Sequence, residues 1–74
     1  METQTPTTFI IEVEQEDDGR WIAEVIELPG VLVYGASQDE AIKNVKALAL
    51  RVIADQLEHG ETESSLSKLS FCAV

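Results

Sequence analysis

Two short turn signals, Asp18-Gly19 and Pro29-Gly30, restrict what this chain can fold into more than any other feature. The sequence around them reads DDGRWIAEVIELPGVLVYG, in which apolar and charged residues alternate. Asp-Gly suits a tight hairpin because both residues tolerate positive φ, and Pro-Gly suits the two central positions of a type II turn. Alternation is typical of a half-buried strand. The pattern therefore predicts an antiparallel meander of three strands, at residues 7–15, 20–27 and 31–34.

The alternation also divides the side chains of the first two predicted strands between the two faces of the sheet. The face expected to pack in the core carries Phe9, Ile11, Val13, Trp21, Ala23 and Val25. The opposite face carries Ile10, Glu12, Glu14, Ile22, Glu24 and Ile26. A single helix covers only one face of a sheet, so we expect this mixed apolar and acidic face to be left uncovered.

A long helix is predicted directly after the third strand. Ser37 and Glu40 form a Ser-x-x-Glu capping box, and Gly60 suits the left-handed position that ends a helix. The predicted core-facing stripe consists of Ile42, Val45, Leu48, Ala49, Val52 and Ile53. A second apolar flank consists of Ala47, Leu50, Ala54 and Leu57. Either the C-terminal strand and its loop pack on this flank, or the flank is an oligomer interface.

One more apolar run, KLSFCAV, predicts a fourth strand at about residues 67–73. The predicted fold class is α+β, with the order β-β-β-α-β: a three-stranded antiparallel meander, one long helix and a C-terminal strand. We expect a single domain over residues 1–74, with a flexible tail at residues 1–6.

The size of the chain and its single cysteine limit how the fold is stabilised. A chain of 74 residues buries only about 60% of its unfolded surface, so its own core gives marginal stability. Cys72 is the only cysteine, so an intrachain disulfide is impossible, and we expect it to pack as a small apolar residue. A homodimer or higher homo-oligomer is therefore expected. The lone thiol and the polar start METQTPTT favour a soluble, cytoplasmic protein without membrane association.

Charge decides between classes of partner. The formal net charge is -9, which disfavours direct binding to nucleic acid and favours basic surfaces. Since 45% of the residues are hydrophobic, this acidity belongs to a folded domain and does not indicate disorder.

Candidate catalytic and metal-binding groups are few. The only histidine, His59, lies at the predicted helix end, where solvated compensation of the helix dipole is its expected role. Glu12, Glu14 and Glu24 share a face and make a Mg²⁺ or Mn²⁺ site conceivable, but acids spaced by two are ordinary on an exposed strand. We therefore predict no enzyme activity, no catalytic residue, no metal site and no cofactor.

The uncovered face is the candidate partner site. An ordinary solvated face with a few exposed isoleucines is one interpretation. The other is a protein-binding surface in which isoleucines supply area and carboxylates select a basic partner. The candidate partner-binding residues are Ile10, Glu12, Glu14, Ile22, Glu24 and Ile26.

The ordered motifs of residues 8–60 resemble the HicB-like antitoxins. The pattern of that family runs Asp-Gly, aromatic, Ala-Glu-Val, Leu-Pro-Gly, then Gly, a small polar residue and a Glu-Ala helix. The matching positions are Asp18, Gly19, Trp21, Ala23, Glu24, Val25, Leu28, Pro29, Gly30, Gly35, Ser37, Glu40 and Ala41.

The resemblance implies a fold, a partner and an assembly. The implied fold is a β-β-β-α-β unit that is described as partial ribonuclease-H-like. The implied partner is a small basic HicA-like toxin that cleaves messenger RNA, and the antitoxin covers its catalytic surface. Family members often form dimers or larger assemblies. Nuclease activity is not carried over, since KLSFCAV has no carboxylate. Many members add a C-terminal DNA-binding domain that this sequence lacks, so we expect no operator binding. A stand-alone oligomer that binds another protein or a small ligand is the alternative.

Overall fold

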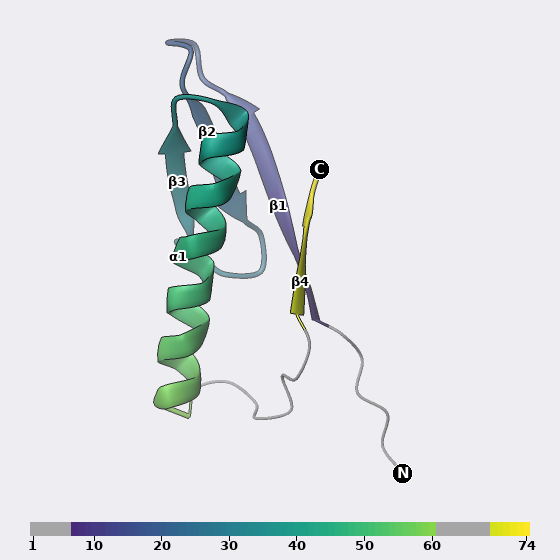
Figure 1. Ribbon diagram of the computed structural model, residues 1–74, viewed down its shortest axis with the longest axis vertical. Coiled ribbons are helices and arrows are strands. Elements are labelled where there is room, and N and C mark those ends of the chain that lie inside the picture. Colours follow the sequence, from purple (N-terminus) through teal and green to yellow (C-terminus); the bar gives the residue numbers. More distant parts are fainter. Residues whose placement is uncertain (1–6, 61–68) are drawn as a thin grey trace.

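The computed structural model of the chain describes residues 7–60 and 69–74 (Figure 1). Its elements are β1 (Thr7–Gln15), β2 (Trp21–Val25), β3 (Leu32–Gly35), α1 (Gln38–Glu58) and β4 (Leu69–Ala73). The strand order in the sheet is β3-β2-β1-β4; the first three strands are antiparallel, and β4 pairs with β1 in parallel. The predicted α+β class is confirmed, as one helix on a four-stranded mixed sheet. The tail at 1–6 and positions 67–68 of the predicted fourth strand lie outside the described residues.

The hairpin between β1 and β2 differs in detail from the prediction. The backbone N–H of Gly19 donates to the Glu16 carbonyl at 2.9 Å, and the N–H of Glu16 donates to the Arg20 carbonyl at 2.7 Å. These bonds enclose a three-residue loop in which one residue, Gly19, has positive φ (93°). The predicted hairpin turn forms at Asp18-Gly19, and of these two residues Gly19 alone has positive φ. A loop of this length needs one left-handed residue, and glycine adopts it without a Cβ clash.

The predicted turn at Pro29-Gly30 is confirmed. Gly30 has φ of 86°, and the N–H of Val31 donates to the Leu28 carbonyl at 3.0 Å. Strand β2 ends at Val25, before the predicted residue 27, because a further turn joins Leu28 N–H to the Val25 carbonyl at 3.1 Å.

Two hydrogen bonds, one between backbone groups and one to a side chain, extend the β1–β2 pairing beyond the end of β2. The N–H of Ile26 donates to the Ile10 carbonyl at 3.0 Å, and the N–H of Ile10 donates to Glu27 Oε1 at 2.9 Å. The Glu27 carboxylate therefore takes the place of a strand carbonyl and satisfies a backbone donor that the turn would otherwise leave unpaired.

Both predicted ends of the helix are confirmed. Ser37 Oγ accepts a hydrogen bond from the N–H of Glu40 at 3.1 Å, and Glu40 Oε1 accepts one from the N–H of Ala36 at 2.6 Å. Gly60 follows the last turn with φ of 69°. His59 lies at the C-cap, where its Nδ1 is 2.8 Å from the Asp55 carbonyl oxygen.

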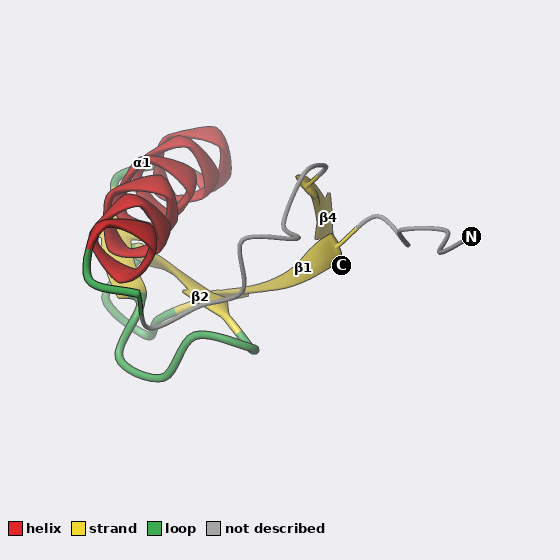
Figure 2. Cartoon of the chain, turned by 90° about the horizontal axis from the view of Figure 1, so that it is seen from below, coloured by secondary structure: helices red, strands yellow, loops and turns green. Residues whose placement is uncertain are grey.

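The core lies between one face of the sheet and one stripe of α1 (Figure 2). Helix α1 packs mainly over β2 and β3, and β1 and β4 extend away from it. The buried residues of the helix are Ala41, Val45, Ala49 and Ile53. The predicted core positions of the sheet include Ile11, Ala23 and Val25, all of which are fully buried. The predicted helix residues Ile42, Leu48 and Val52 pack at the edge of this core.

Close contact between β3 and α1 depends on Gly35. A Cβ atom at Gly35 would lie 2.8 Å from Ala41 Cα and 3.0 Å from the Glu40 carbonyl carbon. These are backbone atoms of the first helical turn, so they cannot rotate away. Glycine at this position therefore allows the helix to begin directly against the sheet. No helix among the described residues is both long and apolar enough to cross a membrane.

Candidate protein-binding surface

The six predicted partner-binding residues lie together as three cross-strand pairs. Glu12 is directly opposite Glu24, and Glu14 is directly opposite Ile22. Ile10 and Ile26 are joined by the backbone hydrogen bond described above. The five that lie within β1 and β2 alternate with buried residues, so their side chains point away from α1. Ile26 directly follows the end of β2 and is exposed. We call this side of the sheet the open face, because no described helix or strand packs on it.

Strands β3 and β4 add residues to the open face that the sequence analysis missed. Leu32 pairs with Glu24, and Tyr34 pairs with Ile22. Cys72 pairs with Ile10 in the parallel β1–β4 register. Val74 continues this register, since its N–H donates to the Ile11 carbonyl at 2.9 Å. Val74 therefore lies beside Glu12, and both line the same hollow.

Most of the exposed large apolar side chains of the described residues belong to the open face. Four of the six lie there, with exposed fractions of 46% for Ile26, 42% for Leu32, 43% for Tyr34 and 70% for Val74. Single exposed apolar residues are ordinary. These four share one sheet face, with the carboxylates of Glu12 and Glu24 between Val74 and Leu32.

The carboxylates of the open face have no ion-pair partner within the described residues. The ion pairs found in ranges 7–60 and 69–74 are Arg20–Asp18 and His59–Asp55. The described bases other than Arg20 lie on α1, at Lys43, Lys46 and Arg51. These three bases share the helix with Asp39, Glu40, Asp55 and Glu58, so no described base other than Arg20 lies at the sheet.

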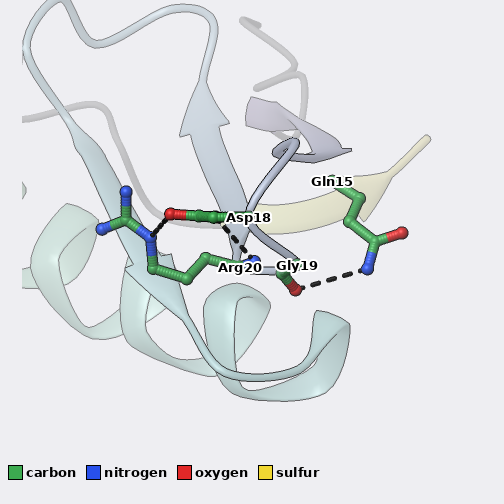
Figure 3. Close-up of polar contacts among 4 residues, drawn as sticks. All are labelled: Gln15, Asp18, Gly19 and Arg20. Atoms are coloured by element: carbon green, nitrogen blue, oxygen red, sulfur yellow. Dashed lines mark hydrogen bonds and ion pairs between the residues drawn. The ribbon is translucent and has the colours of Figure 1, made fainter.

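Arg20 is held at the hairpin end of the open face. Its Nε lies 2.7 Å from Asp18 Oδ2 (Figure 3). Its guanidinium lies 4.3 Å from the ring centre of Tyr34. Asp18 Oδ1 also accepts a hydrogen bond from the Arg20 N–H at 3.0 Å. The backbone hydrogen bond from Arg20 is the main reason why the pKa of Asp18 is below its usual value. Both charges of this pair are engaged in the hairpin.

The acids of the open face border a shallow hollow of about 490 Å³. It is lined by Glu12, Glu14, Glu16 and Glu24, with Ile22 and Val74 among the apolar residues. In the part of the chain that the structure describes, no three histidine, cysteine or acidic side chains converge as metal ligands would. The hollow is thus lined by both carboxylates and apolar side chains, a combination that suits a cationic side chain with an aliphatic stem.

The one cysteine and the one histidine of the chain lie on different elements. Cys72 lies on β4, and His59 lies at the end of α1, where it contacts Asp55. The expectation that Cys72 packs as a small apolar residue was wrong, because Cys72 is exposed. Alternation along β4 directs Phe71 toward Phe9, at a ring separation of 5.8 Å, and turns Cys72 to the open face.

The second apolar flank of α1 is partly exposed. Leu50 and Leu57 have exposed fractions of 47% and 44%, Ala54 is exposed, and Ala47 is half-buried. Strand β4 leaves the two leucines exposed because it pairs edge to edge with β1. Of the two alternatives for this flank, β4 does not cover the two leucines, and the loop named with the strand lies outside the described residues.

Comparisons of the chain with protein-family models, with curated proteins and with solved structures found no significant match.

Proposed function

We propose that the chain is a HicB-like antitoxin, a non-enzymatic module that binds a small basic HicA-like toxin. Binding covers the surface with which the toxin cleaves messenger RNA. The observation that carries this proposal is the open face, on which Glu12 and Glu24 lie side by side without a cation from the described residues. A basic, RNA-binding protein surface is the complement of such a face.

The resemblance to HicB-like antitoxins supports the part of the proposal that concerns the fold. The glycines of the resembling motifs lie where the backbone requires glycine: Gly19 and Gly30 have positive φ, and Gly35 lies against the first turn of α1. Ser37 and Glu40 cap the helix. These residues shape the scaffold, and the partial ribonuclease-H-like assignment is part of this proposal. The open face then supplies the specificity of the module.

Net charge supports rapid capture. A chain of net charge -9 attracts a basic toxin over about one Debye length, roughly 8 Å at physiological salt. The same charge repels the RNA that competes for the toxin surface. A cytoplasmic location, where such a toxin acts, belongs to the same proposal.

The test is a binding measurement with charge-reversal variants. The tagged chain is used to capture partners from lysate of its own cells, and a small basic protein that stays bound is purified and titrated calorimetrically. Glu12→Lys with Glu24→Lys should lower its affinity at least about tenfold, since two attractive contacts become repulsive. Asp55→Lys with Glu58→Lys is the matched control, because it changes net charge equally on α1. Equal loss in both variants, or RNA cleavage by the toxin that the chain does not inhibit, would refute the proposal.

Self-association is a second proposal with its own observation. Leu50 and Leu57 are exposed on α1, on a flank where Lys46 lies one helical turn before Leu50. We propose that a homodimer buries this flank, with Ala47 and Ala54 allowing the helices to approach. Light scattering should give a dimer mass for the wild type and a monomer mass for Leu50→Glu with Leu57→Glu. A monomeric wild type at micromolar concentration would exclude this dimer.

A further inference from the structure

We infer that the open face docks a polypeptide surface whose centre is basic and whose margins are apolar, and that the contact extends across all four strands. Leu32, Tyr34 and Val74 then belong to the binding surface together with the six residues of β1 and β2. The inference deepens the proposed function, on which it rests for the toxin's identity, and it concerns the chemistry of the partner.

The first argument is the order of side chains across the sheet. One transverse row runs Val74, Glu12, Glu24, Leu32, from β4 to β3. Adjacent strands are about 4.8 Å apart, so the row spans about 14 Å. Its two acids are central, and an apolar side chain stands at each end. A partner that buries this row must supply cations at the centre, because an unpaired buried carboxylate is strongly unfavourable.

The second argument is the apolar content of the neighbouring rows. Ile22 and Tyr34 lie on one side of the acidic pair, in a row that also contains Glu14, and Ile10 and Ile26 lie on the other side. A partner with only basic residues would leave these side chains in water and gain nothing from them. Apolar contacts around a charged centre are therefore expected, and the exposed ring of Tyr34 is suited to an interface.

The third argument excludes two other occupants by charge. A second copy docked through its own open face would bring Glu12 and Glu24 against the same acids. Like charges placed together in an interface oppose association. A nucleic acid is excluded in the same way, because its phosphates would meet the carboxylates. The remaining match is a basic protein surface.

The experiment uses defined peptide probes and the isotope-labelled full chain. Three peptides of equal length are titrated in separate samples: one alternates arginine with leucine, one contains arginine alone, and one alternates glutamate with leucine. Backbone amide shifts are followed by NMR. We expect the arginine–leucine peptide to bind at least about fivefold more tightly than the other two and to shift Glu24, Leu32 and Tyr34 most.

Two variants locate the binding site. Leu32→Gln should weaken binding of the arginine–leucine peptide about threefold to tenfold, because it removes an apolar margin and leaves the charge unchanged. Leu50→Gln, a similarly exposed leucine on α1, is the control: it should leave the affinity for this peptide unchanged, whatever it does to the proposed dimer. The amide spectrum of each variant shows that it is folded. Shifts centred on α1, equal binding of the arginine-only peptide, or equal losses in both variants would overturn the inference.

The outcomes separate the inference from the proposed function. If the peptide binds as described but the chain captures no basic toxin, the antitoxin proposal fails and the inference stands. If a toxin is captured but shifts the amides of α1 in place of those of Leu32 and Tyr34, the inference fails and the antitoxin proposal stands. Concentration-dependent shifts of Leu32 without any peptide would identify a second copy as the occupant and overturn the inference.

Discussion

Glu12 and Glu24 lie directly opposite each other on β1 and β2, and neither forms an ion pair with a described basic residue. Opposed like charges destabilise a sheet, because cross-strand side chains are only about 5 Å apart. The fold therefore contains an unfavourable pair at the centre of its open face. A basic partner would relieve it, so stability and binding are expected to respond in opposite directions to a change at this pair.

Glu24→Lys should raise the free energy of unfolding by about 1 kcal/mol, because it converts a repulsive cross-strand pair into an attractive one. For a domain of this size the melting temperature should rise by about 4–8 °C. Thermal unfolding followed by circular dichroism measures the change. Glu14→Lys is the control, since Glu14 is opposite Ile22 and gains no new partner directly across the strand. Equal stabilisation by both variants would mean that net charge, and not the opposed pair, is responsible.

Gly35→Ala should lower the free energy of unfolding by about 3 kcal/mol, because its Cβ would overlap the backbone of Glu40 and Ala41. Gly30→Ala should lower it by only about 1 kcal/mol. Gly30 has no other atom within 4 Å of a Cβ, so the effect comes from its φ of 86° alone. Urea denaturation of both variants gives the comparison. A larger loss for Gly30→Ala would contradict the close packing of β3 against α1.

Ser37→Ala should lower the free energy of unfolding by about 1 kcal/mol, because the N–H of Glu40 loses its acceptor at the first turn of α1. Ser37→Gly should lower it by only about 0.3 kcal/mol, since glycine is tolerated at an N-cap. Chemical denaturation again provides the measurement. If alanine and glycine behave alike, the capping bond is not what begins the helix.

The pH dependence of the hairpin should follow Asp18. Its pKa is lowered in the folded chain, chiefly by the backbone hydrogen bond from Arg20, from a usual value of 3.8. Ionised Asp18 therefore stabilises the fold above that pH, and this contribution is lost as the pH falls through the folded-state pKa. NMR titration of the Asp18 carboxyl should give a midpoint below 3.8. The stability difference between wild type and Asp18→Asn should be constant at higher pH and shrink in acid. A midpoint at or above the usual value would exclude the Asp18–Arg20 contact in solution.

The sequence by itself determined those features that depend on neighbouring residues. Alternation of side chains placed Ile11 and Val25 in the core and Glu12 and Glu24 on the opposite face, because successive strand residues point to opposite sides. The turn at Gly30 and the cap at Ser37 were equally accessible to prediction. Each depends on bonds between residues no more than four positions apart.

Only the tertiary structure decided which distant residues became neighbours. The parallel register of β4 on β1 turned Cys72 and Val74 to the open face, and the pairing of β3 added Leu32 to it. The bond from Ile10 to Glu27 and the packing of Gly35 against Ala41 are likewise absent from any local pattern. Register between separate strands is set by how the whole core packs, and a short run such as LVYG or LSFCA carries no information about its partner. The acids and isoleucines of β1 and β2 were therefore predictable from alternation, whereas the addition of Leu32 and Val74 to the open face required the assembled sheet.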